Sequence, residues 1–187
     1  MFLQKKRGLP SEAHAFFTWI ILYIPIKYVH TGFMKIRELM NENLVEVGAE
    51  LYTKDEALDR LIELQQHDGD IRDALTLSRE VREREQKGSS ALSFRVAVPE
   101  VCHKGAQKTS VSAVTVRKGV DYGAPDKRPV RLIFLIAGKD GSDEYLEAKR
   151  RLTYMLSDMR FTSMLCAAKS NREFLRLIEE KEKKIKN

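Results

Sequence analysis

The apolar run Val130–Ala137 constrains the fold of this chain more than any other segment. It reads Val-Arg-Leu-Ile-Phe-Leu-Ile-Ala, and turn residues from Tyr122 to Asp126 lie shortly before it. A strand with apolar residues at both odd and even positions must be covered on both of its faces. We therefore expect a central strand with other elements packed on each side.

Helical patterns occur both before and after this run. Thr53–Glu56 and Ser170–Glu173 each read as a capping box. In such a box the hydroxyl accepts from the glutamate amide, and the glutamate carboxylate reaches back to the amide of the hydroxyl residue. Apolar spacing then predicts helices over 53–68, 71–86, 142–157, 160–169 and 171–186.

Extended segments are predicted over 44–51, 92–101 and 110–116, the second of them interrupted by Pro99. The chain thus places helices, then strands, then helices again around one buried strand. This order is typical of an α/β fold, in which helices cover a sheet.

Residues 1–33 differ from the rest of the chain. They hold half of the net charge of +6, and Lys5-Lys6-Arg7 precede an apolar run, Ala15–Ile26. As a helix this run would span about 18 Å, shorter than the hydrocarbon core of a membrane at about 30 Å. No small-residue cleavage site of a secretory signal follows it.

An appended helix, a weak membrane-surface anchor and an extension upstream of the true start all fit residues 1–33. We interpret them as an N-terminal extension of doubtful function, and 34–187 as the domain. We do not expect membrane contact. If the chain made such contact, only residues 1–33 would be suited to it.

Composition and motifs exclude several function classes. Cys102 and Cys166 form no CxxC pair, which argues against a disulfide scaffold or cysteine zinc site and favours a cytoplasmic location. Basic and acidic residues interleave beyond residue 33, which indicates a solvated surface and no nucleic-acid interface. Common nucleotide, phosphate-loop, zincin and nucleophile-elbow motifs are absent, and no two of the four histidines are spaced i,i+3 or i,i+4. We therefore expect no cofactor and no metal.

The segment Arg84–Glu100 carries the most specific signal and reads R-E-Q-K-G-S-S-A-L-S-F-R-V-A-V-P-E. It resembles, without a gap, the R-E-x-x-G-S-T-G-I-G-N-G-V-A-I-P-H motif of enzyme IIA (EIIA) domains of the fructose/mannitol class. These domains belong to the bacterial phosphoenolpyruvate-dependent phosphotransferase system (PTS) and include a nitrogen-regulatory branch. Gly119–Asp126, Val130–Ala137 and Ala167–Ser170 resemble further motifs of the family, in the same order. The resemblance implies a mixed central β-sheet flanked by helices, the phosphotransferase/anion transport protein fold.

By this resemblance Glu100 stands where the family has the histidine that takes a phosphoryl group from the carrier protein HPr. Tyr145 stands at the family's second histidine, and Arg84 keeps the family's phosphate-facing arginine. Neutral imidazole is a good nucleophile near pH 7, whereas a carboxylate is a poorer one and repels an incoming phosphoryl anion. Arg84 also fits a simpler role as an exposed cation at a helix end.

Two neighbouring stretches bear on the same site. The family's glycine-rich turn lets its backbone approach the phosphoryl group, and Leu92-Ser93-Phe94-Arg95 replace it here. We expect Phe94 and Arg95 to fill that pocket. His103 is expected as a solvent-exposed residue on the face opposite Glu100, and Cys102 as a buried or half-buried unreactive thiol on the face of Glu100.

Together these residues favour a degenerate EIIA-like protein of the nitrogen-regulatory type, which acts by binding a partner and does not transfer a phosphoryl group on histidine. The partner would be an HPr-like phosphocarrier or a regulated target protein. In a sharper version Glu100 imitates the phosphorylated state, although a carboxylate supplies about −1 charge and a phosphoryl group nearer −2. The alternative is an active phosphocarrier that accepts a phosphoryl group from HPr at His103 or Glu100.

Overall fold

Five strands form one mixed sheet in the computed structural model, which describes residues 34–139 and 142–185. Its strands are β1 (Val45–Ala49), β2 (Val96–Ala97), β3 (Glu100–Cys102), β4 (Ser110–Val120) and β5 (Val130–Gly138). Their order is β1-β4-β5-β2, and β3 follows β2 along the same edge of β5. Only β4 and β5 run antiparallel among these pairs, so the mixed sheet that the family resemblance implied is confirmed.

The predicted central strand is β5, and its side chains fill two cores. Leu132, Phe134 and Ile136 join one apolar cluster, together with residues of α4, α5 and α6. The residues between them, such as Ile133 and Leu135, join a second cluster with residues of α2 and α3. Alternate side chains of one strand thereby reach both faces of the sheet, as the apolar run predicted.

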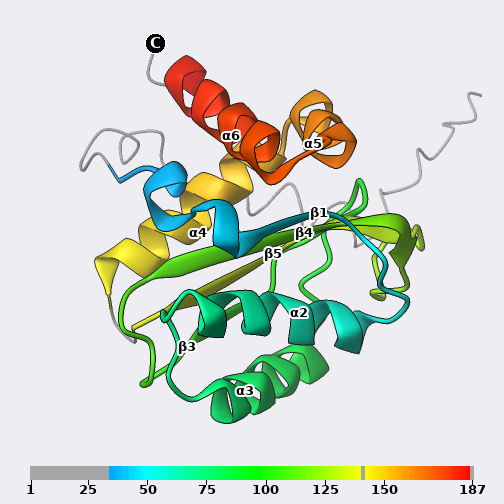
Figure 1. Cartoon of the computed structure of the whole chain (residues 1–187). Helices are drawn as coiled ribbons and strands as arrows, with labels where there is room; N and C mark the ends of the chain where they lie inside the picture. The colour runs from blue at the N-terminus through cyan, green and yellow to red at the C-terminus, as the bar shows by residue number, and fades with distance from the viewer. Residues whose placement is uncertain (1–33, 140–141, 186–187) are drawn as a thin grey trace, which may run out of the picture. The chain divides into compact units, whose positions relative to one another are not determined.

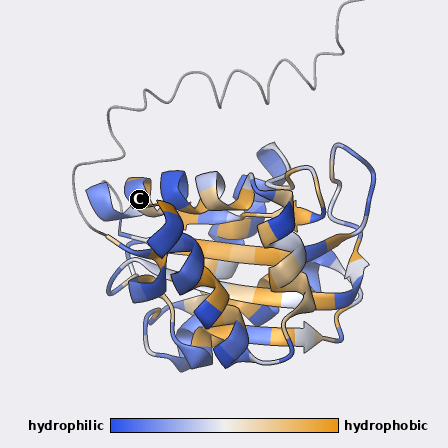
Figure 2. Ribbon diagram, turned by 90° about the horizontal axis from the view of Figure 1, so that it is seen from above, coloured by the Kyte–Doolittle hydropathy of each residue, from blue (hydrophilic) through white to orange (hydrophobic). Residues whose placement is uncertain are grey.

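Helices cover both faces of this sheet. On one face lie α2 (Lys54–His67) and α3 (Ala74–Lys87), and on the other lie α4 (Asp143–Leu156), α5 (Met159–Ala167) and α6 (Asn171–Ile185) (Figure 1). Two short 3-10 helices, η2 (Ile36–Leu39) and η3 (Glu42–Leu44), lead into β1. In Figure 2 the strands are largely apolar, whereas the helices carry many hydrophilic residues. The α/β prediction is therefore confirmed.

The extended segment predicted over 92–101 is only partly a strand. It contains the two-residue β2 and the start of β3, which Val98 and Pro99 separate. Proline has no N–H to donate to a ladder, so pairing is interrupted there. The Pro99 carbonyl still accepts from the Ile136 amide of β5 at 3.0 Å, which keeps β3 aligned on the sheet.

Both predicted capping boxes form, with one difference from the expected pattern. The Glu56 amide donates to the Thr53 hydroxyl at 3.1 Å, as predicted, and the box before α6 does the same. The two glutamate carboxylates, however, accept from the amide one residue earlier than expected. These donors are Tyr52 and Lys169, each at 2.8 Å.

The helix predicted from residue 71 begins at Ala74 instead. Asp73 has a non-helical backbone and its carboxylate accepts from the Thr76 amide at 3.0 Å, so it caps the first turn.

The predictions for residues 1–33 fall outside the described residues. In the part of the chain that the structure describes, no helix is long and apolar enough to cross a membrane.

Candidate functional site

Glu100 opens the edge strand β3 and lies between helices from opposite faces of the sheet. β3 runs parallel to the end of β5, and its register partners are Ile136, Ala137 and Gly138. Val101 points into the apolar cluster of α2 and α3, whereas Cys102 packs against the cluster of α4. Side chains alternate along a strand, so Glu100 shares the α4 side with Cys102.

Two cations hold the Glu100 carboxylate. Its Oε1 lies 2.5 Å from Lys149 Nζ and 3.6 Å from Arg84 Nη2. The Glu100 side chain is only 13% exposed, whereas the Arg84 and Lys149 side chains are 50% and 46% exposed. Arg84 lies in the last turn of α3 and Lys149 lies on α4, so each face of the sheet supplies one cation. Glu100 and Arg84, which the family resemblance assigned to one site, therefore form an ion pair.

Lys149 is not among the site residues predicted from the sequence. It follows Tyr145 by four residues on α4, and residues at this spacing lie on the same face of a helix. This spacing was the available signal, because the family resemblance places Tyr145 at the site.

Tyr145 lies in the first turn of α4 and is buried. Its amide donates to the hydroxyl of Ser142, which caps the helix, at 3.3 Å. A Cβ on Gly138 would lie 2.7 Å from Tyr145 Cδ2, so the last residue of β5 must be small for the ring to fit. Burial raises the pKa of the Tyr145 hydroxyl, and the nearby Glu100 carboxylate and Cys102 thiol raise it further. Tyr145 is thus held as a neutral hydroxyl beside the carboxylate.

We expect folding stability to fall steeply above about pH 10, the ordinary tyrosine pKa, because Tyr145 and Tyr122 both have raised pKa values in the folded protein. Burial is the main cause for both. Above that pH the unfolded chain loses a proton that the folded protein keeps, so each tyrosine contributes a loss of about 1.4 kcal/mol per pH unit. The stability is fully present below the unfolded pKa. Urea unfolding at pH values from about 9 to 11 measures this slope.

The matched variants are Tyr145→Phe and Tyr122→Phe. Each should make the fall of the free energy of unfolding with pH shallower. Tyr154, which is 61% exposed, supplies the control, because Tyr154→Phe removes the titratable hydroxyl of a residue that water already reaches in the folded protein. If neither Tyr145→Phe nor Tyr122→Phe changes the dependence of stability on pH, the two buried tyrosines are not its cause.

The prediction that His103 is solvent-exposed is wrong. The side chain is 2% exposed, and its Nδ1 lies 2.8 Å from Oε2 of Glu80 on α3. β3 ends at Cys102, and the chain then turns, with the Ala106 amide donating to the His103 carbonyl at 3.1 Å. The turn directs the ring toward α3. Nε2 has no hydrogen-bond partner and would lie 2.5 Å from a Cβ on Gly105, so the ring is enclosed on that side too.

Cys102 is half-buried, which agrees with its prediction.

Phe94 and Arg95 do not fill a pocket, contrary to their prediction. Phe94 is 41% exposed and Arg95 is also exposed. Their φ values are +67° and +66°, the left-handed region that glycine favours and that costs other residues about 1–3 kcal/mol.

The backbone of this turn is held by hydrogen bonds to β5 and to the turn before it. The Arg95 carbonyl accepts from the Arg131 and Leu132 amides at 2.9 and 3.2 Å, and the Phe94 amide donates to Asp126 at 3.2 Å. The Phe94 and Arg95 side chains are therefore exposed while their backbone stays in the left-handed region.

Chemically, the site presents one anion, held by two half-exposed cations, beside a neutral hydroxyl. Within residues 34–139 and 142–185 no three His, Cys, Asp or Glu side chains come together as a group that could hold a metal ion.

Comparison with a family model identifies most of the chain. The model described as phosphoenolpyruvate-dependent sugar phosphotransferase system, EIIA 2, matches residues 38–181.

Two curated relatives agree with this match. The fructose-specific EIIABC component of Bacillus subtilis (strain 168) is 24% identical over 151 residues, which are 80% of this chain and 24% of that protein. The fructose-specific EIIA component of Haloferax volcanii is 24% identical over 119 residues, which are 63% of this chain and 77% of that protein. The chain thus spans about a quarter of the length of the first relative and most of the second.

Solved structures share the fold. The nitrogen regulatory protein IIA-Ntr of Neisseria meningitidis matches with a TM-score of 0.70 at 23% identity, covering 76% of this chain and 98% of that one. Mannitol IIA of Escherichia coli matches with a TM-score of 0.65 at 23% identity, covering 74% and 98%. Enzyme IIA-mannitol in its complex with phosphorylated enzyme IIB-mannitol, also from Escherichia coli, matches with a TM-score of 0.66 at 24% identity, covering 75% and 97%.

Proposed function

The chain belongs to the EIIA 2 family of the phosphoenolpyruvate-dependent sugar phosphotransferase system, and from this premise we propose that it is a regulatory member that binds partner proteins without accepting a phosphoryl group on histidine. The nitrogen-regulatory branch and a cytoplasmic location are parts of the same proposal. Its partner is an HPr-like phosphocarrier or a regulated target protein.

The ion-paired carboxylate of Glu100 is the observation that carries this proposal. By the sequence resemblance, it stands at the position of the family's phosphorylated histidine. Both cations that could stabilise an incoming phosphoryl group, Arg84 and Lys149, already hold the Glu100 oxygen at 3.6 and 2.5 Å. A second anion at this place would compete with the carboxylate for them and be repelled by it.

The position of His103 supports the same function. A phosphoryl acceptor needs a ring nitrogen that its donor can reach. Here Nδ1 is hydrogen-bonded to the Glu80 carboxylate, and Nε2 is buried beside Gly105. The imidazole therefore offers no open nitrogen to a phosphorylated carrier in this conformation.

The surface beside Glu100 suits a protein partner. Leu146, the residue after Tyr145, is 53% exposed, and the cations Arg84 and Lys149 are about half exposed. Apolar area next to exposed Arg is a common composition of protein interfaces. In this reading Glu100 supplies the fixed negative charge that a phosphohistidine would supply only after phosphorylation, at about half of its magnitude.

We expect no phosphoryl adduct when the full chain is incubated with phosphorylated HPr at neutral pH and its intact mass is measured. A family member that carries the histidine, run in parallel, shows that the donor is active. The variants Glu100→Gln and His103→Asn identify the acceptor if an adduct forms. Asparagine keeps a donor for Glu80, so the second variant preserves the buried hydrogen bond.

An adduct that Glu100→Gln abolishes would make the chain an acyl-phosphate carrier. One that His103→Asn abolishes would make it a histidine phosphocarrier after a conformational change. Either result overturns the proposal.

A further inference from the structure

A second charged site lies at the other end of the sheet from Glu100. It is a cavity of about 330 Å³ between β1, β4, the start of β5 and the end of α5. Its polar lining consists of Thr115, Arg117, Arg131 and Lys169. Arg131 precedes Ile136, the register partner of Glu100, by five residues, which is about 17 Å along a strand.

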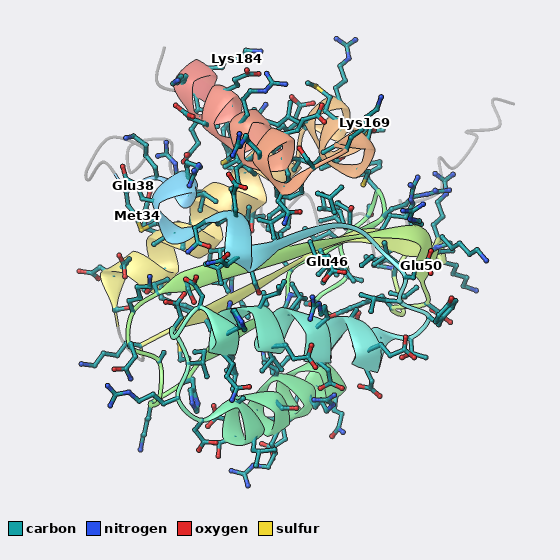
Figure 3. All side chains as sticks on the ribbon, viewed as in Figure 1. Met34, Glu38, Glu46, Glu50, Lys169 and Lys184 are labelled. Carbon is teal, nitrogen blue, oxygen red and sulfur yellow. The ribbon has the colours of Figure 1, made fainter. Side chains whose placement is uncertain are left out.

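This cavity is positively charged. Three cationic side chains line it and no carboxylate does. Within the described part of the chain, none of these three cations forms an ion pair, although most other surface arginines of the domain do. Glu46 and Glu50 flank the β1 wall of the cavity in sequence but do not line it, and Glu46 pairs with Arg60 instead. Figure 3 labels Lys169, Glu46 and Glu50 in this part of the molecule.

The two guanidinium groups are held in place by the backbone. Arg117 Nε donates to the Gly48 carbonyl at 2.9 Å, and Arg131 Nε donates to the Val116 carbonyl at 3.4 Å. In both arginines Nε donates to a backbone carbonyl. Their terminal nitrogens make no hydrogen bond to another described residue. Gly48 has a φ of +77°, and its missing Cβ would lie 3.5 Å from Arg117 Nε, so the guanidinium packs directly on the backbone.

The lining also contains the hydroxyl of Thr115 and the thiol of Cys166. Thr115 Oγ1 accepts from the Gly48 amide at 2.7 Å, which orients the hydroxyl. Cys166 also lines the cavity, and burial raises the pKa of its thiol although Arg131 and Arg95 act in the other direction.

We propose that this cavity binds the phosphoryl group of a small phosphate monoester, through the terminal nitrogens of Arg117 and Arg131 and the ammonium of Lys169. Guanidinium forks match the geometry of phosphate oxygens, and fixing them in advance lowers the entropic cost of binding. The volume is at the lower end of the range for small-molecule sites, about 300–1,000 Å³, so it suits a phosphate with a few carbon atoms. This inference does not depend on the function proposed for Glu100.

The test is isothermal titration of the full chain with three probes: inorganic phosphate, glycerol phosphate and glycerol. We expect saturable binding of both phosphate-bearing probes and none of glycerol. Tighter binding of glycerol phosphate would assign the site to a monoester, and equal or tighter binding of inorganic phosphate would overturn the monoester assignment. Sodium chloride at matched ionic strength controls for charge screening.

Arg117→Gln should weaken phosphate binding by about tenfold or more, because a hydrogen bond to a charged group is worth about 1.5–3 kcal/mol. Arg117 and Lys169 are exposed, so Arg117→Gln and Lys169→Gln leave the core intact and remain informative even if Arg131→Gln does not fold. Lys184→Gln, an exposed lysine on α6, is the matched control and should bind as the parent does.

Arg84→Gln separates this site from the one at Glu100 and should also leave binding unchanged. Absence of saturable binding, equal binding in Arg117→Gln and Lys169→Gln, or a loss confined to Arg84→Gln would each overturn the proposal.

Discussion

Glu182→Gln should lower the free energy of unfolding by about 3–5 kcal/mol, the usual cost of removing one partner of a buried ion pair. The Glu182 side chain is 2% exposed and Arg151, its partner at 2.9 Å, is 10% exposed. The same carboxylate accepts from the Ile36 and Arg37 amides at 2.8 and 3.2 Å. One charge therefore neutralises a buried guanidinium and also ties η2 to α6, so glutamine would leave Arg151 uncompensated and weaken both amide contacts.

Glu179→Gln on the same helix is the matched control. Its pair with Lys183 is exposed, with side chains 46% and 71% accessible, and such surface pairs contribute little to stability because solvent screens them. Urea unfolding of the two variants gives the comparison directly. A loss at Glu182 no larger than that at Glu179 would show that the buried carboxylate is not needed to hold the N-terminal part of the domain on α6.

The centre of the sheet could be predicted from the sequence because an apolar strand must be covered on both faces. Val130–Ala137, in which Arg131 is the one polar residue, has apolar residues at both odd and even positions, so it led directly to the central β5. Helix starts were predictable to within a few residues, because capping side chains mark them. The glutamates of the two capping boxes reached one amide further back than expected, since the carboxylate is long enough to contact either amide.

The weakly patterned segment 92–101 was less predictable. β-rich composition cannot show that Pro99 divides the strand, nor that Phe94 and Arg95 adopt left-handed backbone. Their conformation is set by tertiary hydrogen bonds to β5, not by local preference. Because the left-handed backbone turns both side chains outward, the expectation that they would fill a pocket failed.

At the site, only the family resemblance assigned Glu100 and Arg84 to the same place; their spacing in the sequence does not predict an ion pair. Lys149 lies on a third element, α4, and its approach depends on how that helix packs across the sheet. The exposure of His103 was mispredicted for a similar reason. Its ring lies on the α3 side, opposite Glu100 as strand alternation predicted, but it is buried beside Glu80 of α3, which sequence spacing does not show.

Glu100→His should convert the chain from a protein without a phosphoryl adduct into one that accepts a phosphoryl group from phosphorylated HPr. The new imidazole would lie near Arg84 and Lys149, which now hold the carboxylate at 3.6 and 2.5 Å. Two adjacent cations favour the neutral imidazole, which is the nucleophilic form, and stabilise the charge of the transferred group. A ring nitrogen attacks phosphorus as the P–N bond of the donor breaks, and the donor imidazole keeps the electron pair and takes up a proton.

Intact mass at neutral pH measures the outcome, with Glu100→Gln as the control that removes the charge without supplying a nucleophile. Adding Arg84→Gln to the histidine variant should slow the transfer, because one of the two cations that stabilise the phosphoryl group is lost. If the histidine variant folds and gains no adduct, the missing imidazole is not the only barrier. The exposed side chains on the Phe94–Arg95 turn would then be the next barrier to remove, by Phe94→Asn and Arg95→Gly, which restore the family's residues at two positions whose φ is already +67° and +66°. An adduct that appears with the imidazole alone would show that the scaffold can bind the donor and orient the phosphoryl group once an acceptor is supplied.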